Sequence, residues 1–296
     1  MIWVLIDLSY LAHRARCALH GLEHEDYPTG VIFGFLEQLR SICTDPKVLS
    51  NRVALFADSK KSHRKQSFPE YKQKRVDNRT EEEREQISIM WDQVRLLQTK
   101  ILPESGFKIY RQVGLESDDL IAMAASQFEG TQTQAIMVTS DGDLYQCIRD
   151  SVHWYDPSRG TCHNPASFLA ARGISPHRWG EVKSIAGCSS DGVPGIQGVG
   201  EQTAVKYLTG CLPSRYKTYQ AITSENGQRI VARNKPLVIL PHERTKTVDL
   251  REPRYNPGEF FDLCKRYGIV SYLQGPKRNA WIRFFHGHKR IRFRRR

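Results

Sequence analysis

Short apolar runs alternate with amphipathic stretches through the first half of the chain. Residues 2–6, 53–57 and 135–139 form such runs, and an aspartate follows each of them within two positions. These runs predict parallel strands that are buried on both faces. Helical patterns lie between them, at 9–19, 31–42, 81–100 and 117–128. The alternation predicts an α/β fold with a central, mostly parallel sheet flanked by helices.

The pattern changes at two places. Residues 59–80 are basic and polar with few apolar positions, which predicts a mobile arch that leads into the helix at 81–100. After residue 163, short helices and Gly/Pro turns replace the alternation. We therefore expect a core domain at 1–163 that carries a basic arch at about 59–100, and a second subdomain at 164–296 that ends in a basic tail.

Acidic residues follow the predicted strands and open a predicted helix. Because the ends of parallel strands meet at one edge of a sheet, where such folds bind their ligands, we expect these carboxylates to converge. Two carboxylates about 4 Å apart repel by about 1–4 kcal/mol, so a cluster needs cations or shared protons. Carboxylates suit hard divalent cations such as Mg²⁺. The candidate metal ligands are Asp7, Asp58, Glu116, Asp118, Asp119, Asp141, Asp143 and Asp191.

Two parts of this acidic set have a second interpretation. On a helix, Glu116 and Asp119 share one side and Asp118 points to another. This arrangement suits the binding of two metal ions. The same residues at a helix start also serve as caps for free amides. Asp141-Gly142-Asp143 fits an ordinary turn as well as a metal site, although no Glu stands at the twelfth position that an EF-hand requires.

Composition narrows the class of protein. Lys and Arg total 44 against 32 Asp and Glu, a formal charge of +12. A basic body around an acidic centre suits an enzyme that draws in phosphates, whereas a protein that is basic only for solubility is the alternative. The seven cysteines are scattered and form no C-x-x-C, which argues for a reducing compartment without disulfides or a zinc ribbon. No apolar stretch is long enough to cross a membrane.

A glycine-rich stretch at 187–204 is the most specific local pattern. Gly195, Gly198 and Gly200 let the backbone approach a ligand closely, and Thr203 enters the next helix, whose first amides can hold a phosphate. A P-loop is the competing interpretation, but the Gly-Lys-Ser/Thr ending is absent. We favour a helix–hairpin–helix that holds a nucleic-acid backbone.

Two basic stretches contain interleaved aromatic residues. The first, at 60–75, includes Phe68 and Tyr71 and predicts a channel for single-stranded nucleic acid, although a charge run is often only a solvated face. The second runs from Arg283 to Arg296, with Trp281, Phe284, Phe285 and Phe293 interleaved. It fits a DNA-binding tail or a segment that docks on a partner.

In this order, the motifs resemble the 5′-nuclease (flap endonuclease) family, which includes the N-terminal domain of bacterial DNA polymerase I and stand-alone phage 5′–3′ exonucleases. The matching segments are D-x-S-Y-L-x-x-R at 7–14, R-x-x-x-x-P-x-Y-K-x-x-R at 64–75, E-x-D-D at 116–119, S-D-x-D at 140–143 and D-x-x-P-G-I-x-G-x-G-x-x-T-A at 191–204. Beyond about residue 210 the resemblance is weak.

The resemblance implies a PIN-like nuclease core with a helical arch and a C-terminal helix–hairpin–helix subdomain. It implies hydrolysis of DNA phosphodiester bonds at 5′ ends and flaps in replication or repair, with two Mg²⁺ for which Mn²⁺ substitutes, and a monovalent cation such as K⁺ at the hairpin. Asp7, Asp58, Glu116 and Asp118 would serve one metal, and Asp119, Asp141, Asp143 and Asp191 the other. Lys72 and Arg14 would stabilise charge on the scissile phosphate. The implied DNA contacts are His13, Arg64, Tyr71, Arg75, Gly195, Gly198, Gly200 and Thr203.

Three departures from the family pattern change these expectations. Cys188 stands where an Asp is usual, and because a neutral thiol is a poor Mg²⁺ ligand we expect weaker binding of the second metal. His13 replaces an aromatic residue, and imidazole stacks on a base less strongly. Gln202 replaces a usual lysine, which removes one phosphate contact and predicts a smaller salt dependence of binding.

The expected partners are DNA with 5′ flaps and recessed or nicked duplexes, with RNA primers as a further candidate. We expect a monomer that binds no membrane and acts in the cytoplasm, or in the host cytoplasm if a phage encodes it, and whose protein partners are unknown. The lack of an appended polymerase sequence favours a stand-alone enzyme. Two alternatives stay open: a relative that binds branched DNA but cuts it weakly, which Cys188 favours, and a PIN-like ribonuclease, against which the hairpin and the arch argue.

Overall fold

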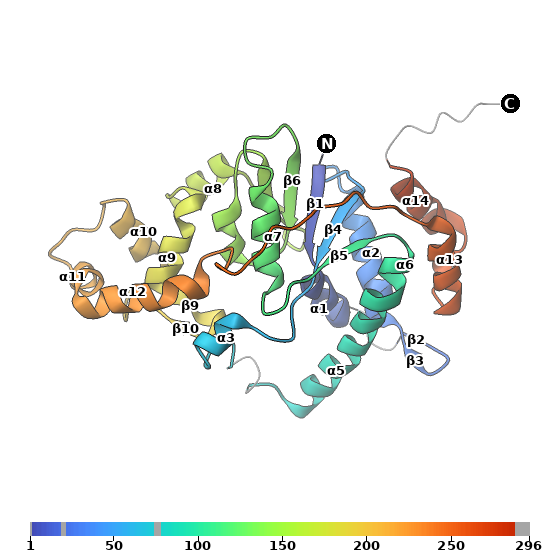
Figure 1. Cartoon of the computed structure of the whole chain (residues 1–296), viewed down its shortest axis with the longest axis horizontal. Coiled ribbons are helices and arrows are strands. Elements are labelled where there is room, and N and C mark those ends of the chain that lie inside the picture. The colour runs from blue at the N-terminus through green and yellow to red at the C-terminus, as the bar shows by residue number, and fades with distance from the viewer. Residues whose placement is uncertain (1, 19–21, 74–77, 288–296) are drawn as a thin grey trace.

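The centre of the molecule is a six-stranded sheet (Figure 1). The computed structural model describes residues 2–18, 22–73 and 78–287. The strand order is β5-β4-β1-β6-β7-β8, in which only β8 is antiparallel to its neighbour. The strands are β1 (Ile2–Asp7), β4 (Arg52–Phe56), β5 (Lys108–Tyr110), β6 (Gln134–Val138), β7 (Val152–Asp156) and β8 (Thr161–His163). The predicted α/β fold with a mostly parallel sheet is therefore confirmed.

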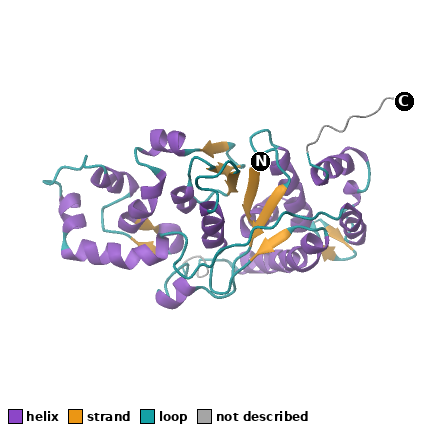
Figure 2. Cartoon of the chain, turned by 45° about the horizontal axis from the view of Figure 1, so that its top comes forward, coloured by secondary structure: helices purple, strands orange, loops and turns teal. Residues whose placement is uncertain are grey.

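The three strands predicted from apolar runs form the middle of this sheet. β1 lies between β4 and β6, with Leu5 in register with Ala54 and Met137. Val4, Leu5 and Ile6 are fully buried, because helices cover both faces of the sheet (Figure 2). A strand buried on both sides needs no polar alternation, which is why these segments are continuous apolar runs.

Two apolar layers flank the sheet. One contains α1 (Leu8–Ala18), α2 (Gly30–Thr44) and α5 (Glu81–Leu96), and the other contains α7 (Ser117–Ser126) and α9 (Trp179–Ala186). Thr80 and Glu83 form reciprocal hydrogen bonds that start α5, a capping box. The helix continues through a π-helical segment, Leu97–Ile101, into α6 (Leu102–Glu104). A small hairpin of β2 (Glu23–His24) and β3 (Tyr27–Pro28) precedes α2.

The basic segment after β4 is anchored in its described part. It contains α3 (His63–Ser67), and Tyr71 packs with Cys188, Val193, Leu237 and Val238 in a separate apolar cluster. Burial of apolar and aromatic side chains fixes this part of the chain, although its composition predicted a mobile arch. Lys74 and Arg75 lie outside the described residues.

The second half of the chain adds a group of short helices beside the sheet. The group comprises α8 (Pro165–Arg172), α10 (Glu201–Leu208), α11 (Lys217–Thr223), α12 (Glu225–Val238), α9 and the two-stranded ribbon of β9 (Gly187–Cys188) and β10 (Val193–Pro194). Short 3₁₀ segments at Gly142–Cys147, Pro176–Arg178, Ser189–Asp191 and Val270–Tyr272 complete the fold. In the described residues, no helix is both long and apolar enough to cross a membrane.

The last two helices return to the opposite end of the molecule. After α12, the chain crosses the sheet, and α13 (Pro257–Arg266) and α14 (Gly275–Phe285) lie beside α2, far from α10 to α12 (Figure 1). Trp281, Phe284 and Phe285 are buried there, in the same apolar layer as α1 and α2. These aromatic residues therefore do not belong to a free DNA-binding tail. The division of the chain at residue 163 stays a prediction, but α13 and α14 pack on the core.

The packing of α13 and α14 predicts a large effect on stability. Phe260 is fully buried and its ring centroid is 4.5 Å from that of Trp281. We expect Phe260→Ala to lower the free energy of unfolding by about 3–5 kcal/mol, because the substitution leaves a cavity. Urea denaturation measures this value. Val270→Ala is the control: its side chain is 65% exposed, and we expect a change within about 0.5 kcal/mol. Similar losses in both variants would contradict the packing.

Candidate metal and nucleic-acid site

The carboxylates that follow the parallel strands meet at one edge of the sheet. Asp7 ends β1, Asp58 follows β4, and Asp141 follows β6. Ser9 links the first two: its amide donates to Asp7 Oδ1 at 2.8 Å, and its hydroxyl donates to Asp58 Oδ2 at 2.7 Å. The amide of Ser117, in the first turn of α7, donates to Asp58 Oδ1 at 2.8 Å. These bonds join β1, β4 and the start of α7 around one acidic centre.

Proximity and burial raise the pKa values in this centre. Burial, and then the nearby charge of Asp58, raise the pKa of Asp7 to about 7. Burial, and then the charges of Asp141 and Asp7, raise the pKa of Asp118 well above its ordinary value. Burial and the charge of Asp143 raise the pKa of Asp141. These shifts are what buried, crowded carboxylates produce, and the nearby charge of Lys72 offsets only part of the effect at Asp118 and Asp141.

The donor set fits a hard divalent cation. Asp118 Oδ1 is buried without a hydrogen-bond partner, so one oxygen in the centre of the group is free to coordinate. The surrounding groups are carboxylate oxygens, the ligands that Mg²⁺ and Mn²⁺ prefer. The roles of the individual acids as ligands stay predictions.

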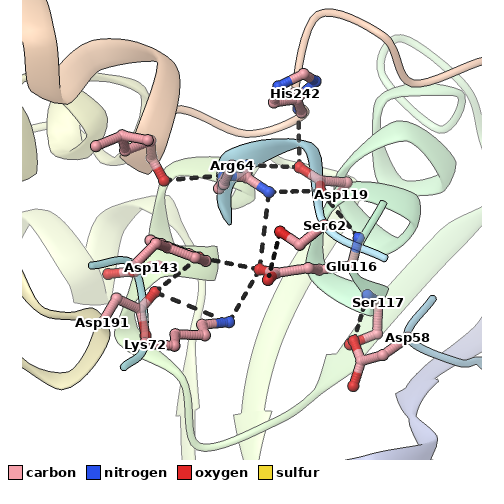
Figure 3. Close-up of polar contacts among 12 residues, drawn as sticks. Asp58, Ser62, Arg64, Lys72, Glu116, Ser117, Asp119, Asp143, Asp191 and His242 are labelled. Atoms are coloured by element: carbon pink, nitrogen blue, oxygen red, sulfur yellow. Dashed lines mark hydrogen bonds and ion pairs between the residues drawn. The ribbon is translucent and has the colours of Figure 1, made fainter. Parts of the chain in front are cut away.

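Lys72 contacts two carboxylates next to this centre, Glu116 and Asp191 (Figure 3). Its ammonium is 2.9 Å from Glu116 Oε2 and 4.0 Å from Asp191 Oδ2. Its backbone amide donates to the Asp191 carbonyl at 2.7 Å, and its φ of 58° is a conformation that lysine seldom adopts. Burial alone would lower the pKa of Lys72, but the charges of Glu116 and Asp191 outweigh burial and raise it. Lys72 therefore keeps its proton and places a positive charge beside the carboxylates.

A second acidic group lies next to the first. Side-chain ligand atoms of Asp143, Cys188 and Asp191 all lie within 4.8 Å of one another. The ammonium of Lys183 is 3.0 Å from Asp143 Oδ1 and 3.0 Å from Glu201 Oε1. The sequence patterns did not single out Lys183 or Glu201, because a basic residue late in α9 and an acidic residue at the start of α10 are ordinary helix-end positions.

Arg64 and Asp119 do not fit their predicted roles. The Arg64 guanidinium forms two hydrogen bonds with Asp119, at 2.6 and 2.7 Å (Figure 3). It also donates to the Leu237 carbonyl at 2.9 Å. Arg64 is 3% exposed and Asp119 is 0% exposed. Burial alone would raise the pKa of Asp119, but the hydrogen bonds and charge of Arg64 outweigh it and lower that pKa. Asp119 also accepts from the His242 amide at 2.8 Å, so its oxygens are occupied and a metal would compete with Arg64.

Tyr71 is also buried rather than open to a base. Its hydroxyl lies 3.0 Å from Glu116 Oε2 and 3.0 Å from Asp191 Oδ2, so it connects the two acidic groups. The Arg14 guanidinium lies over the ring of Tyr10, 5.5 Å from the ring centroid, and both residues belong to α1. His13 meets the edge of Trp91 from α5, with ring centroids 6.1 Å apart. Arg75 lies outside the described residues.

The hairpin glycines have different roles. A Cβ at Gly195 would lie 2.1 Å from the Ala186 carbonyl, so this glycine permits close packing on α9. Gly198 has a φ of 75°, and a Cβ there or at Gly200 would meet no other atom within 4 Å. Gly198 and Gly200 are exposed immediately before α10, which contains Thr203. The open backbone amides of this turn suit a phosphate, whereas Gly195 serves packing.

The Arg64–Asp119 pair predicts a test of its structural role. Arg64→Leu leaves a buried, unpaired carboxylate, so we expect the free energy of unfolding in urea to fall by about 3–5 kcal/mol. Arg64→Leu/Asp119→Leu removes both charges and should recover part of that loss. Arg229→Leu, which breaks the exposed Arg229–Glu225 pair, should change the same quantity by at most about 1 kcal/mol. A double variant no more stable than Arg64→Leu would contradict this assignment.

The raised pKa of Asp7 predicts a pH dependence of stability. In metal-free protein between about pH 4 and pH 7, folded Asp7 holds a proton that the unfolded chain releases. Its contribution to the free energy of unfolding therefore falls as pH rises through this window. Thermal denaturation in a chelator should show a steeper loss of stability with pH for the wild type than for Asp7→Asn. Mg²⁺ should reduce the wild-type loss. Parallel profiles for the two proteins would show that Asp7 titrates normally.

Comparisons with known proteins identify the family and the fold. The chain is 31% identical to DNA polymerase I of Mycobacterium bovis over 252 residues, which cover 80% of this chain and 27% of the polymerase, so it spans about a quarter of that relative. It is 28% identical to a 5′-3′ exonuclease of Buchnera aphidicola over 208 residues, 69% of each protein. The fold matches the bacteriophage T5 D15 flap endonuclease in a complex with DNA and metal ions, with a TM-score of 0.67, 18% identity, and 81% of this chain and 90% of the other covered. Residues 2–173 match the family described as the 5′-3′ exonuclease N-terminal resolvase-like domain, and the chain belongs to this family.

Proposed function

We propose that this chain is a divalent-metal-dependent 5′–3′ exonuclease and structure-specific flap endonuclease that hydrolyses DNA in replication or repair. The observation that carries this proposal is the buried carboxylate centre at the sheet edge, with the positive charge of Lys72 beside it. The family's relatives include 5′-3′ exonucleases and polymerases, which supports the proposal.

The residues suited to hold a first cation are Asp7, Asp58, Asp118 and Asp141, with Glu116 beside them. Asp143 and Asp191 suit a second position. Bound Mg²⁺ or Mn²⁺ would supply the Lewis-acid chemistry that activates water and stabilises negative charge on a phosphate. Asp119 is not among these proposed ligands, because both of its carboxylate oxygens accept hydrogen bonds from Arg64.

Lys72 supplies positive charge at this site, on a side chain that is only partly buried. Its side chain is 28% exposed while its ammonium contacts Glu116, so it can exchange that carboxylate for a phosphate oxygen. The Tyr71 hydroxyl contacts both Glu116 and Asp191, the two carboxylates that lie next to the Lys72 ammonium. Arg14, stacked on Tyr10, would act on the same phosphate. A positive charge aimed at the developing negative charge is a large catalytic contribution.

The proposed substrates are 5′ flaps and recessed or nicked duplexes, with RNA primers as a further candidate. The formal charge of +12 favours a polyanion. The exposed backbone at Gly198 and Gly200 would hold one strand of the duplex, with a K⁺ ion as a proposed addition at this turn. His13 and Trp91 would flank the displaced strand.

A cleavage assay tests this proposal. Three labelled DNAs (a 5′ flap, a recessed duplex and a single strand) are incubated with Mg²⁺. We expect cutting near the flap junction or stepwise release from 5′ ends, loss of cutting in Asp141→Ala, and a fall in kcat of about 10²–10³ for Lys72→Ala. Asp249→Asn, at an exposed ion pair with Arg251, is the control and should keep wild-type activity.

The opposite result has a defined meaning. If the wild type binds the flap but leaves it intact in both Mg²⁺ and Mn²⁺, the chain is a branched-DNA-binding relative. If it cuts none of the three DNAs but cuts the same substrates made of RNA, the PIN-like ribonuclease interpretation holds.

A further inference from the structure

The group of Asp143, Cys188 and Asp191 differs in donor chemistry from the rest of the acidic site. Each of the three is buried, and their ligand atoms lie within 4.8 Å of one another. Within residues 2–18, 22–73 and 78–287, it is the one group of three such residues that meets this separation. Two oxygen donors and one sulfur donor therefore face a common point.

The sulfur points into this group. Cys188 Sγ is 3.4 Å from Asp143 Oδ2 and 3.1 Å from the Ser190 hydroxyl. The antiparallel β9–β10 ribbon holds the residue in place, with Cys188 in register with Val193. The thiol therefore occupies a ligand position, and its place does not depend on a flexible loop.

Sulfur and oxygen donors select different cations. Mg²⁺ prefers oxygen ligands in octahedral geometry and keeps several waters. A thiolate is a soft ligand that favours Zn²⁺ and similar ions, which also accept carboxylate oxygens. A thiol in place of one carboxylate therefore changes which ion this position binds best, in addition to weakening the binding of Mg²⁺.

Charges around the group permit such an ion to enter. Lys183 is shared between Asp143 and Glu201, at 3.0 Å from each. The ammonium can remain with Glu201 when a cation takes the Asp143 oxygen. On binding, the S–H bond of Cys188 breaks, its proton leaves to solvent, and a metal–sulfur bond forms, so the thiolate adds a negative charge that the cation offsets.

We propose that Cys188 makes the Asp143–Cys188–Asp191 group selective for a thiophilic divalent cation of the Zn²⁺ class over Mg²⁺. The all-oxygen centre around Asp7 and Asp118 keeps its preference for hard ions. The inference deepens the proposed function, on which it rests for the role of this position in cleavage, but the binding is measured without DNA.

Co²⁺ absorption spectroscopy tests the proposal on the full, reduced, metal-free chain. Co²⁺ is a spectroscopic probe for Zn²⁺ sites, and a thiolate ligand gives a charge-transfer band in the near ultraviolet. We expect this band in the wild type, its loss in Cys188→Ser and Cys188→Ala, and its retention in Cys147→Ser, a buried thiol outside the group. Zn²⁺ should abolish the band, and excess Mg²⁺ should not.

Calorimetry of Cys188→Asp gives a second measurement. This variant restores three carboxylates, so we expect its Mg²⁺ affinity at this position to rise by on the order of 10–100-fold and the Co²⁺ band to be absent. Circular dichroism of each variant checks that it is folded. The exposed Cys17, Cys162 and Cys211 are present in every protein and cancel in the comparison.

Three results would overturn the proposal: no band in the wild type, a band that survives in folded Cys188→Ser, or bleaching of the band by Mg²⁺. Failure of the proposed function is a separate result. If the wild type shows the Cys188-dependent band but cuts no DNA, the proposed selective site stands and the proposed nuclease function is wrong. If the wild type cuts flaps but shows no band, the proposed nuclease function stands and the proposed selective site is wrong.

Discussion

Electrostatic repulsion among buried carboxylates at one sheet edge is the constraint on which the rest of this structure depends. Three cationic side chains offset part of it: Arg64 pairs with Asp119, Lys72 with Glu116 and Asp191, and Lys183 with Asp143. The ion pairs of the described residues leave Asp7, Asp58, Asp118 and Asp141 without a cationic partner. The raised pKa values of Asp7, Asp118 and Asp141 follow from this imbalance, and a bound divalent cation would remove it.

The same charge pairs connect distant parts of the chain. Arg64 bonds to Asp119 of α7 and to the Leu237 carbonyl at the end of α12, and Asp119 receives the amide of His242. Asn234 of α12 donates to the Ser184 and Pro194 carbonyls, at 3.1 and 3.0 Å, which ties α12 to α9 and β10. The basic segment, the acidic helix start and the hairpin region are thus held together by buried polar contacts. Removing one partner of such a contact leaves a buried polar group without a hydrogen bond, which costs about 1–3 kcal/mol.

The two acidic groups share this support but differ in chemistry. Tyr71 bridges them through hydrogen bonds to Glu116 and Asp191. The first group contains oxygen donors, and the second contains the sulfur of Cys188. This chain therefore has two neighbouring acidic groups on one scaffold, and the two differ in ligand chemistry.

The sequence by itself determined the three central strands, the four helices α1, α2, α5 and α7, and the edge of the sheet where the acids meet. Strands buried on both faces are continuous apolar runs, and the aspartates at their ends had to reach one edge of a parallel sheet. It did not show that Arg64 and Asp119, 55 positions apart, neutralise each other, or that Lys183 sits 40 positions from Asp143 in the second group. Nor did it show that Trp281, Phe284 and Phe285 are core residues beside α2 and not part of a DNA-binding tail. Local periodicity reports which face of an element is apolar, whereas ion pairs and helix docking depend on long-range packing, and only the tertiary structure decided those.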